Sequence, residues 1–197
     1  MKIKEFIHRY SKNRILKKVA EKELKCDKDK IKSVTNLGTE IVSIIEGVVL
    51  RELNYVESVN DLMGVASSIF ADNLSHSKEI KKSLIEREMK SSTYLKGFNM
   101  ILHCKDEKIT SCKFGIIRLK EKLVENNNEI DFAIVSLIPE KNTETQINIM
   151  SHINGEIIEK KSFREAIKKS SEEELKEIIE KILGDLYKKE LKSIMEE

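Results

Sequence analysis

Three short apolar runs in the middle of the chain constrain its fold more than any other feature. They span residues 98–104, 112–119 and 132–138, and the last stops before Pro139, the one proline of the chain. Runs of this kind, bounded by charged and turn-forming residues, predict strands. A shorter apolar stretch at residues 48–50, followed by Leu53, predicts a first strand upstream, and three asparagines at 126–128 predict a turn.

Apolar residues at helical spacing surround these runs on both sides. With one proline and seven glycines in 197 residues, the chain favours long helices over a turn-rich all-β fold. Helices are predicted at residues 31–47, 58–70, 77–90, 144–156 and 162–169, and a last one begins at a capping box of Ser171 and Glu174. Alternating helices and strands predict an α/β fold, a small mixed sheet flanked by helices.

Composition excludes several classes of protein. Charged residues make up 36% of the chain but nearly cancel to +2, which gives no overall argument for nucleic acid as a partner. Three cysteines without CxxC spacing argue against a disulfide framework or a zinc site. No apolar run approaches the roughly 20 residues that a bilayer crossing needs, and the N-terminus lacks the apolar core of a signal peptide. We therefore expect a soluble, cytoplasmic protein without membrane insertion.

The N-terminal segment differs from the rest in its charge. Residues 1–35 hold 12 Lys and Arg against 5 Asp and Glu. Such an arm can touch nucleic acid, but its only aromatic residues are Phe6 and Tyr10, so a solvated helix is the better interpretation. We predict a basic helical linker or N-terminal extension at residues 1–38 and one domain at residues 39–197.

The segment 84–104 carries the strongest functional signal. A charged helix ends on Arg87-Glu88, a polar turn follows with Ser92 and Thr93, and an apolar strand then stops on His103. A neutral imidazole at a strand end can act as a nucleophile near neutral pH, and an arginine nearby can hold a phosphate. Ser92 and Thr93 can shape the turn or bind a phosphate through their hydroxyls.

The remaining histidines and cysteines carry weaker signals. Cys104 follows His103 on the opposite face of the strand, so it is expected to be a small core residue. His8 and His76 are expected to face solvent, and His152 to have a packing role.

In order and spacing, these motifs resemble the mannitol/fructose-type enzyme IIA domain of the bacterial sugar phosphotransferase system. The resemblance runs from Arg87-Glu88 through Ser92-Thr93 and His103 to the strands at 114–119 and 133–139, and on to the closing helices. It implies that His103 accepts a phosphoryl group and that Arg87 stabilises the phosphate. It also implies that a phosphocarrier protein donates that group and that a IIB cysteine receives it. The protein would be a phosphoryl carrier rather than a turnover enzyme, with no metal or nucleotide cofactor.

Two departures from the family pattern modify this expectation. Transport-type members have Pro-His-Gly where this chain has Leu102-His103-Cys104, and they have a second histidine where this chain has Gln146. Gln146 can donate a hydrogen bond to a phosphate, but it cannot carry a positive charge or shuttle a proton. The chain is in this respect more similar to the IIA-like module at the C-terminus of mannitol-type transcriptional regulators, which are antiterminator-like activators.

This resemblance leaves three functions open. The leading hypothesis is a regulatory module in which phosphorylation of His103 alters contacts with other regulator domains or with a IIB protein. The alternatives are a transport IIA that relays phosphate for sugar uptake, and a docking module that binds IIB without being phosphorylated. The basic segment can be the linker of a larger regulator or the start of a separately encoded protein. Mannitol is implied only by the resemblance, so the sugar stays open.

Overall fold

The computed structural model describes residues 28–95 and 100–195. Its helices and strands, in chain order, are α3 (Lys28–Glu46), β1 (Val49–Leu53), α4 (Val59–Phe70), α5 (Leu74–Lys90), β2 (Met100–Asp106), β3 (Lys113–Glu125), β4 (Asn128–Pro139), α6 (Glu144–Glu159), α7 (Lys161–Ile167) and α8 (Glu172–Met195). Most of the predicted basic segment, residues 1–27, lies outside the described residues. Helix α3 runs without a break across the predicted domain boundary at residue 38, and that boundary stays a prediction.

The four strands form one mixed sheet in the order β1-β3-β4-β2. The outer strands β1 and β2 run parallel to their neighbours β3 and β4, whereas β3 and β4 are antiparallel to each other. Asn126 and Asn127 make the turn between β3 and β4 with positive φ angles, a backbone conformation that asparagine tolerates well. The predicted small mixed sheet flanked by helices is confirmed.

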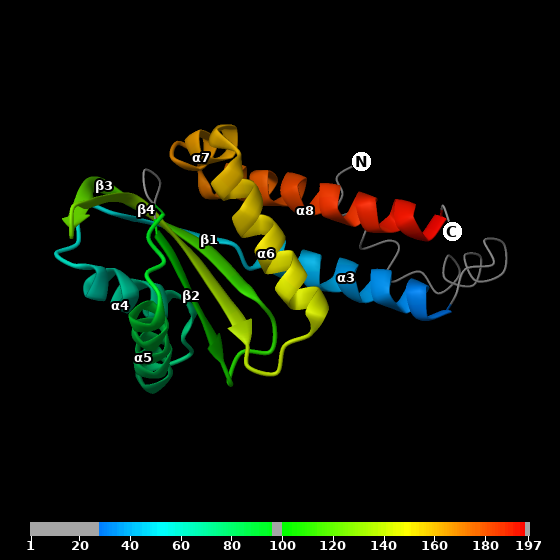
Figure 1. The fold of residues 1–197 in the computed structure, drawn as a ribbon, viewed down its shortest axis with the longest axis horizontal. Coiled ribbons are helices and arrows are strands. Elements are labelled where there is room, and N and C mark those ends of the chain that lie inside the picture. The colour runs from blue at the N-terminus through cyan, green and yellow to red at the C-terminus, as the bar shows by residue number, and fades with distance from the viewer. Residues whose placement is uncertain (1–27, 96–99, 196–197) are drawn as a thin grey trace.

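Helices cover both faces of the sheet (Figure 1), and the described residues form one apolar core on each face. Helices α4 and α5 bury Leu62, Ile80 and Leu84 against one face, with Met100, Leu102 and other strand residues. Helices α3, α6 and α8 bury a larger cluster against the other face, where Phe114 and Phe132 belong to the sheet. In β4, for example, Phe132 and Ile134 belong to one core and Ala133 and Val135 to the other, as the two-residue repeat of a strand requires.

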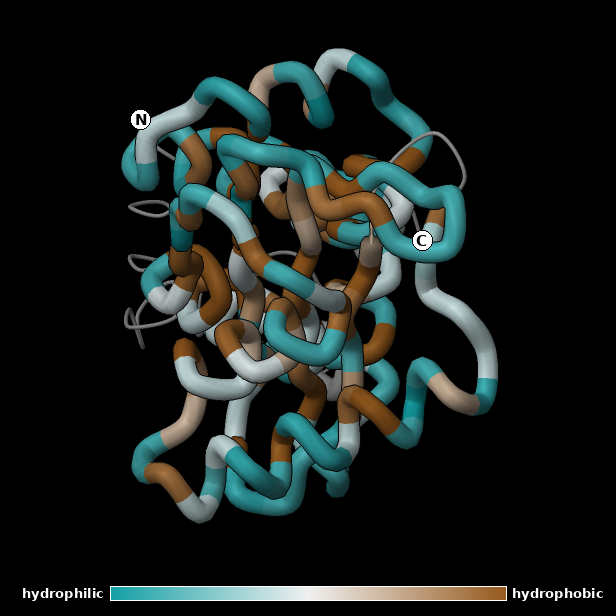
Figure 2. Tube along the Cα trace, turned by 90° about the vertical axis from the view of Figure 1, so that its left-hand side faces the viewer, coloured by the Kyte–Doolittle hydropathy of each residue, from teal (hydrophilic) through white to brown (hydrophobic). Residues whose placement is uncertain are grey.

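Figure 2 shows the hydropathy of the chain: apolar segments lie mainly in the interior and polar segments mainly at the edges. Among the residues that the structure describes, no helix is long and apolar enough to cross a membrane.

Side-chain caps explain where several helices begin. Helix α4 begins after Ser58, whose hydroxyl accepts from the Asp61 amide, and α5 begins after Asn73 in the same manner. The predicted capping box of α8 is confirmed, because the Ser171 amide donates to the Glu174 carboxylate and the Glu174 amide to the Ser171 hydroxyl. Such caps satisfy backbone N–H groups that have no partner within the helix.

Several predicted limits were wrong. Helix α5 begins at Leu74 rather than at residue 77, because the cap at Asn73 starts it one turn earlier. Strands β3 and β4 extend well beyond the predicted runs, because their hairpin pairing continues through charged residues as far as Glu125 and Asn128. Strand β2 does not end on His103 but continues to Asp106, since its pairing with β4 runs on to Pro139. His103 therefore lies within an edge strand.

Candidate functional site

The alternation of β2 determines which face each of its residues occupies. Met100, Leu102 and Cys104 belong to the core beneath α4 and α5, and Ile101 packs on the opposite core. His103 shares the face of Ile101, since side chains two residues apart point the same way along a strand. The ring is half-buried. Because β2 is an edge strand, residues from both faces can reach His103 around its free edge.

Arg87, in the last turn of α5, reaches His103. Its Nε atom donates a hydrogen bond to Nε2 of the imidazole at 2.9 Å, and its Nη1 atom donates to the Ser91 carbonyl at 3.1 Å. The second bond holds the guanidinium at the end of the helix. The two residues that the sequence pattern singled out are therefore in direct contact.

This contact indicates the tautomer of the ring. Since Nε2 accepts from Arg87, a neutral imidazole carries its proton on Nδ1. The Nδ1 atom is buried and forms no regular hydrogen bond with the described residues. Nε2 is therefore the atom with a lone pair facing the guanidinium.

Burial of the ring lowers the pKa of His103 below 6.5, and the positive charge of Arg87 lowers it further. The backbone of Ile101 and the carboxylate of Glu88 act in the opposite direction and do not reverse the shift. A histidine with a lowered pKa is neutral at pH 7, which is the form that can act as a nucleophile.

Glu88 organises the turn between α5 and β2. Its carboxylate accepts from the Thr93 amide at 2.9 Å and from the Thr93 hydroxyl at 2.5 Å. The Ser92 hydroxyl accepts from the Tyr94 amide at 3.3 Å, and the Thr93 carbonyl accepts from the Ile101 amide at 3.2 Å. Ser92 and Thr93 thus lie in the turn next to Arg87, and their hydrogen bonds shape that turn. A direct role in phosphate binding stays a prediction.

Gln146 is engaged elsewhere. Its side chain closes the capping box of α6 with Thr143, and its Nε2 group donates to Glu40 of α3 at 3.1 Å. The residue is buried, and no hydrogen bond joins it to His103 or Arg87 in the described part of the chain. Its predicted part in phosphate binding stays untested.

The structure adds two residues that the sequence reasoning missed. Ser136 of β4 is the Cα partner of His103 and lies on the same face of the sheet. Its buried hydroxyl donates to the Asn154 side chain of α6 at 3.2 Å. The sequence shows Ser136 as a lone hydroxyl residue within the apolar run 132–138, but it does not reveal that this residue pairs with His103 on the neighbouring strand.

The two cysteines that the structure describes, Cys104 and Cys112, are both buried, and burial raises the pKa of each. Cys104 is buried, as expected, and burial together with the charge of Asp106 raises its pKa to about 12, so the thiol stays protonated. Within residues 28–95 and 100–195, no group of three or more His, Cys, Asp and Glu side chains offers a metal site.

The sequence model of one protein family, described as phosphoenolpyruvate-dependent sugar phosphotransferase system, EIIA 2, matches residues 44–182. This is well over half of the chain, and it includes Arg87, His103 and Gln146. The chain belongs to this family. As an EIIA 2 domain, it carries extra length at both ends of the match, including most of α3 and the last turns of α8.

Solved structures of IIA domains have the same fold. The nitrogen regulatory protein IIA-Ntr from Neisseria meningitidis is 23% identical, with a TM-score of 0.59, covering 68% of this chain and 97% of that one. A candidate PTS IIA domain from Streptococcus pyogenes M1 GAS is 13% identical, with a TM-score of 0.50, covering 73% and 94%. No curated protein matches the chain in a sequence search.

Proposed function

We propose that this EIIA 2 domain carries a phosphoryl group on His103 and that Arg87 stabilises it. The observation that supports this most is the hydrogen bond from Arg87 Nε to His103 Nε2, because it combines a neutral imidazole with a fixed cation. Phosphoryl transfer between side chains needs alignment and charge neutralisation rather than further covalent chemistry.

The reaction follows from the tautomer. The Nε2 lone pair of His103 attacks the phosphorus of a phosphohistidine on the phosphocarrier protein. A new N–P bond forms, the donor N–P bond breaks, and its electron pair returns to the donor ring, which leaves as a neutral imidazole because its other nitrogen carries a proton. The proton on Nδ1 of His103 stays in place, and the Arg87 guanidinium exchanges the ring nitrogen for a phosphate oxygen as its hydrogen-bond acceptor.

Within this function we favour the regulatory role. Phosphorylation adds nearly two negative charges at neutral pH, enough to alter docking at a surface. Gln146 is neutral, is committed to α6 and α3, and cannot act as a proton shuttle, which suits a slowly transferred phosphate better than a rapid relay. The domain would then be a cytoplasmic module of a mannitol-type transcriptional regulator that responds to sugar supply. Its partners would be the phosphocarrier protein, a IIB domain and upstream domains of the regulator.

The test is direct phosphorylation. The protein is incubated with enzyme I, the phosphocarrier and labelled phosphoenolpyruvate, and we expect acid-labile label that His103→Ala abolishes. His152→Ala is the matched control, since it removes another half-buried histidine from the same domain. Absence of label with active partners would indicate a docking module without phosphorylation.

A second measurement separates regulation from transport. The labelled protein is mixed with a IIB protein, and transfer to the IIB cysteine is followed over time. Slow or absent transfer with a long-lived phosphohistidine supports the regulatory role. Transfer within seconds supports the uptake relay.

A further inference from the structure

Helix α5 presents one stripe of side chains to β2. His76, Ile80 and Leu84 are its buried residues, and they recur at every fourth position. Arg87 follows three residues after Leu84, so it continues the same stripe. The stripe thus begins with a polar residue, continues with two apolar residues and ends with the arginine that contacts His103.

The opposing strand is organised in a similar way. Met100, Leu102 and Cys104 of β2 are buried against α4 and α5, and Asp106 ends the same alternating series. Asp106 is itself buried, with 7% of its surface exposed. A buried carboxylate is costly unless hydrogen bonds or a cation compensate it. This series therefore also ends on a polar group that needs partners.

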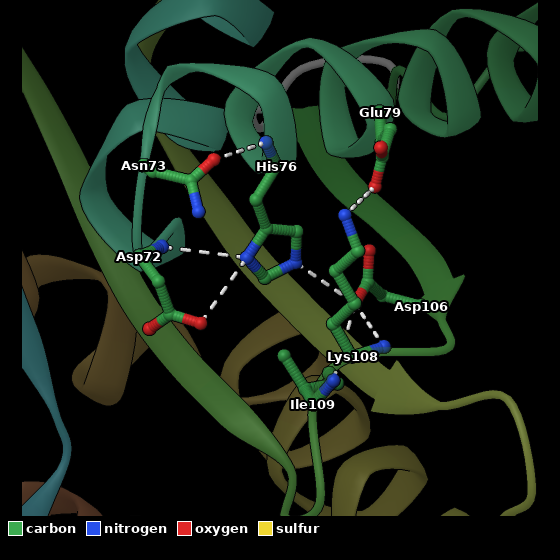
Figure 3. A network of polar contacts seen from close by, with 7 residues as sticks. All are labelled: Asp72, Asn73, His76, Glu79, Asp106, Lys108 and Ile109. Carbon is green, nitrogen blue, oxygen red and sulfur yellow. Dashed lines mark hydrogen bonds and ion pairs between the residues drawn. The ribbon is translucent and has the colours of Figure 1, made fainter.

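The two polar ends meet. Nε2 of His76 lies 2.9 Å from Oδ1 of Asp106, and His76 is 1% exposed (Figure 3). The expectation that His76 faces solvent was therefore wrong, because its partner lies thirty residues further along the chain. The same Asp106 oxygen also accepts from the amides of Lys108 and Ile109, which holds the loop after β2.

The other side of the His76 ring is held as well. The Asp72 amide donates to Nδ1 at 3.3 Å, and the Asp72 carboxylate lies 3.5 Å from the same atom. With Nδ1 accepting, the neutral ring carries its proton on Nε2 and donates it to Asp106. An ion pair between Lys108 and Glu79 joins the same helix and loop at the surface (Figure 3).

Helix α5 is thus bound to β2 by a histidine contact at each end, whereas the apolar contacts between them are non-directional. We propose that the His76–Asp106 pair is a positioning device that fixes α5 along β2, and thereby holds Arg87 at hydrogen-bonding distance from His103. This proposal rests on the proposed function of His103. It assigns His76 and Asp106 a role in alignment and not in the chemical step. A misplacement of about 1 Å can lower a transfer rate by about a hundredfold.

The test compares two replacements of His76. His76→Phe keeps a flat aromatic ring, somewhat larger than imidazole, and removes both hydrogen bonds of the His76 ring. His76→Gln retains an N–H donor at nearly the reach of Nε2, so it should rescue the contact with Asp106. Ile179→Ala in α8 is the control for lost stability alone, because Ile179 is buried in the core on the other face of the sheet.

Two readouts are expected to change together. In His76→Phe, the NMR titration of His103 should shift towards 6.5, because Arg87 no longer stays close enough to lower its pKa. The rate of phosphorylation by the phosphocarrier should fall on the order of tenfold or more. His76→Gln and Ile179→Ala should stay within about twofold of the original rate, with an unchanged titration.

The proposal is overturned if folded His76→Phe matches Ile179→Ala in both readouts, because His76 would then be purely structural. Should His76→Phe fail to fold, Asp106→Ser, too short to reach His76, is compared with Asp106→Asn, which retains the acceptor. If only Asp106→Ser raises the His103 midpoint and slows phosphorylation, the positioning role is supported. If the two Asp106 variants behave alike, the positioning role is overturned. The titration needs no phosphoryl transfer, so failure of the proposed function remains distinguishable from failure of the positioning device.

Discussion

Arg87 donates its Nε–H to Nε2 of His103 across 2.9 Å, so the guanidinium contacts the very atom that would attack phosphorus. The two residues come from different elements, the last turn of α5 and the edge strand β2. The guanidinium can therefore stay bound while the phosphoryl group arrives, because it needs only to exchange the ring nitrogen of His103 for a phosphate oxygen as its hydrogen-bond acceptor.

The first prediction concerns the charge at this position. Arg87→Ala should slow phosphorylation of His103 by about a hundredfold, because a preorganised cation at developing charge contributes this much in comparable sites. Arg87→Lys should recover only part of the rate, since an ammonium cannot reproduce the planar fork of a guanidinium. The measurement is the initial rate of labelling at fixed phosphocarrier concentration.

Lys90→Ala is the matched control for that series, because Lys90 is the other basic residue in the last turn of α5. Its labelling rate should equal that of the unmodified protein. If Arg87→Ala and Lys90→Ala label equally fast, the guanidinium has no part in the transfer.

The second prediction concerns pH. Burial and Arg87 lower the pKa of His103 below 6.5, so the nucleophilic neutral ring stays dominant as the pH falls through 6.5. An NMR titration of the His103 ring should give a midpoint below 6.5, and Arg87→Ala should raise that midpoint. A midpoint at or above 6.5 in the unmodified protein would contradict the site geometry.

The same shift predicts a change in stability. Between pH 6.5 and the lowered pKa, the unfolded chain binds a proton on residue 103 that the folded protein does not bind. The free energy of unfolding should therefore fall as the pH drops through this window. Urea unfolding at several pH values measures this effect. His103→Gln should lose the fall in unfolding free energy within this pH window, and His152→Gln should retain it.

The sequence predicted local structure well and long-range pairing poorly. The capping box at Ser171 and the strand around Phe132 follow from a few neighbouring residues, and both are present. The sequence pattern and the family resemblance both placed Arg87 near His103, but neither indicated the direct hydrogen bond between them, since sixteen residues separate the two. The burial of His76 was missed because its partner, Asp106, lies thirty residues further along the chain and beyond the end of the predicted strand.

Strand order could not be predicted either. The pairing of β2 with β4 places Ser136 opposite His103, and no local pattern determines that register. Polar residues at the ends of strands and helices, such as Asp106, look solvent-exposed in a sequence when their partners lie far along the chain. Arg87 and Ser136 also lie far along the chain from His103, so the site was predicted less completely than the fold.

The fourth prediction concerns the turn before β2. Thr93→Val removes the hydroxyl that donates to Glu88 and keeps the β-branched shape. A hydrogen bond to a charged acceptor contributes about 1.5–3 kcal/mol, so unfolding should become easier by about that amount. Ser92→Ala is the control: its hydroxyl only accepts a weaker 3.3 Å bond from the Tyr94 amide, and its loss should matter less. Equal denaturant midpoints for the two variants would show that the Glu88–Thr93 contact does not stabilise the turn.

The last prediction separates Gln146 from the transfer reaction. Its side chain accepts from the Thr143 amide and donates to Glu40, whose second carboxylate oxygen is buried without a hydrogen bond in the described part of the chain. Gln146→Leu removes both contacts and leaves that carboxylate less compensated, so the free energy of unfolding should fall by about 1–3 kcal/mol. In Gln146→Leu, the rate of His103 phosphorylation and the midpoint of the His103 titration should both stay unchanged, because the hydrogen bonds of Gln146 go to α6 and α3.

Thr143→Ala supplies the matched control, because it removes the hydroxyl of the same capping box and leaves the amide that reaches Glu40. Thr143→Ala should lower the free energy of unfolding by about 1 kcal/mol, the usual loss for an N-cap hydroxyl. If Gln146→Leu slows phosphorylation at least tenfold while Thr143→Ala does not, Gln146 contacts the phosphate in the transfer complex. The prediction that Gln146 binds the phosphate would then be supported.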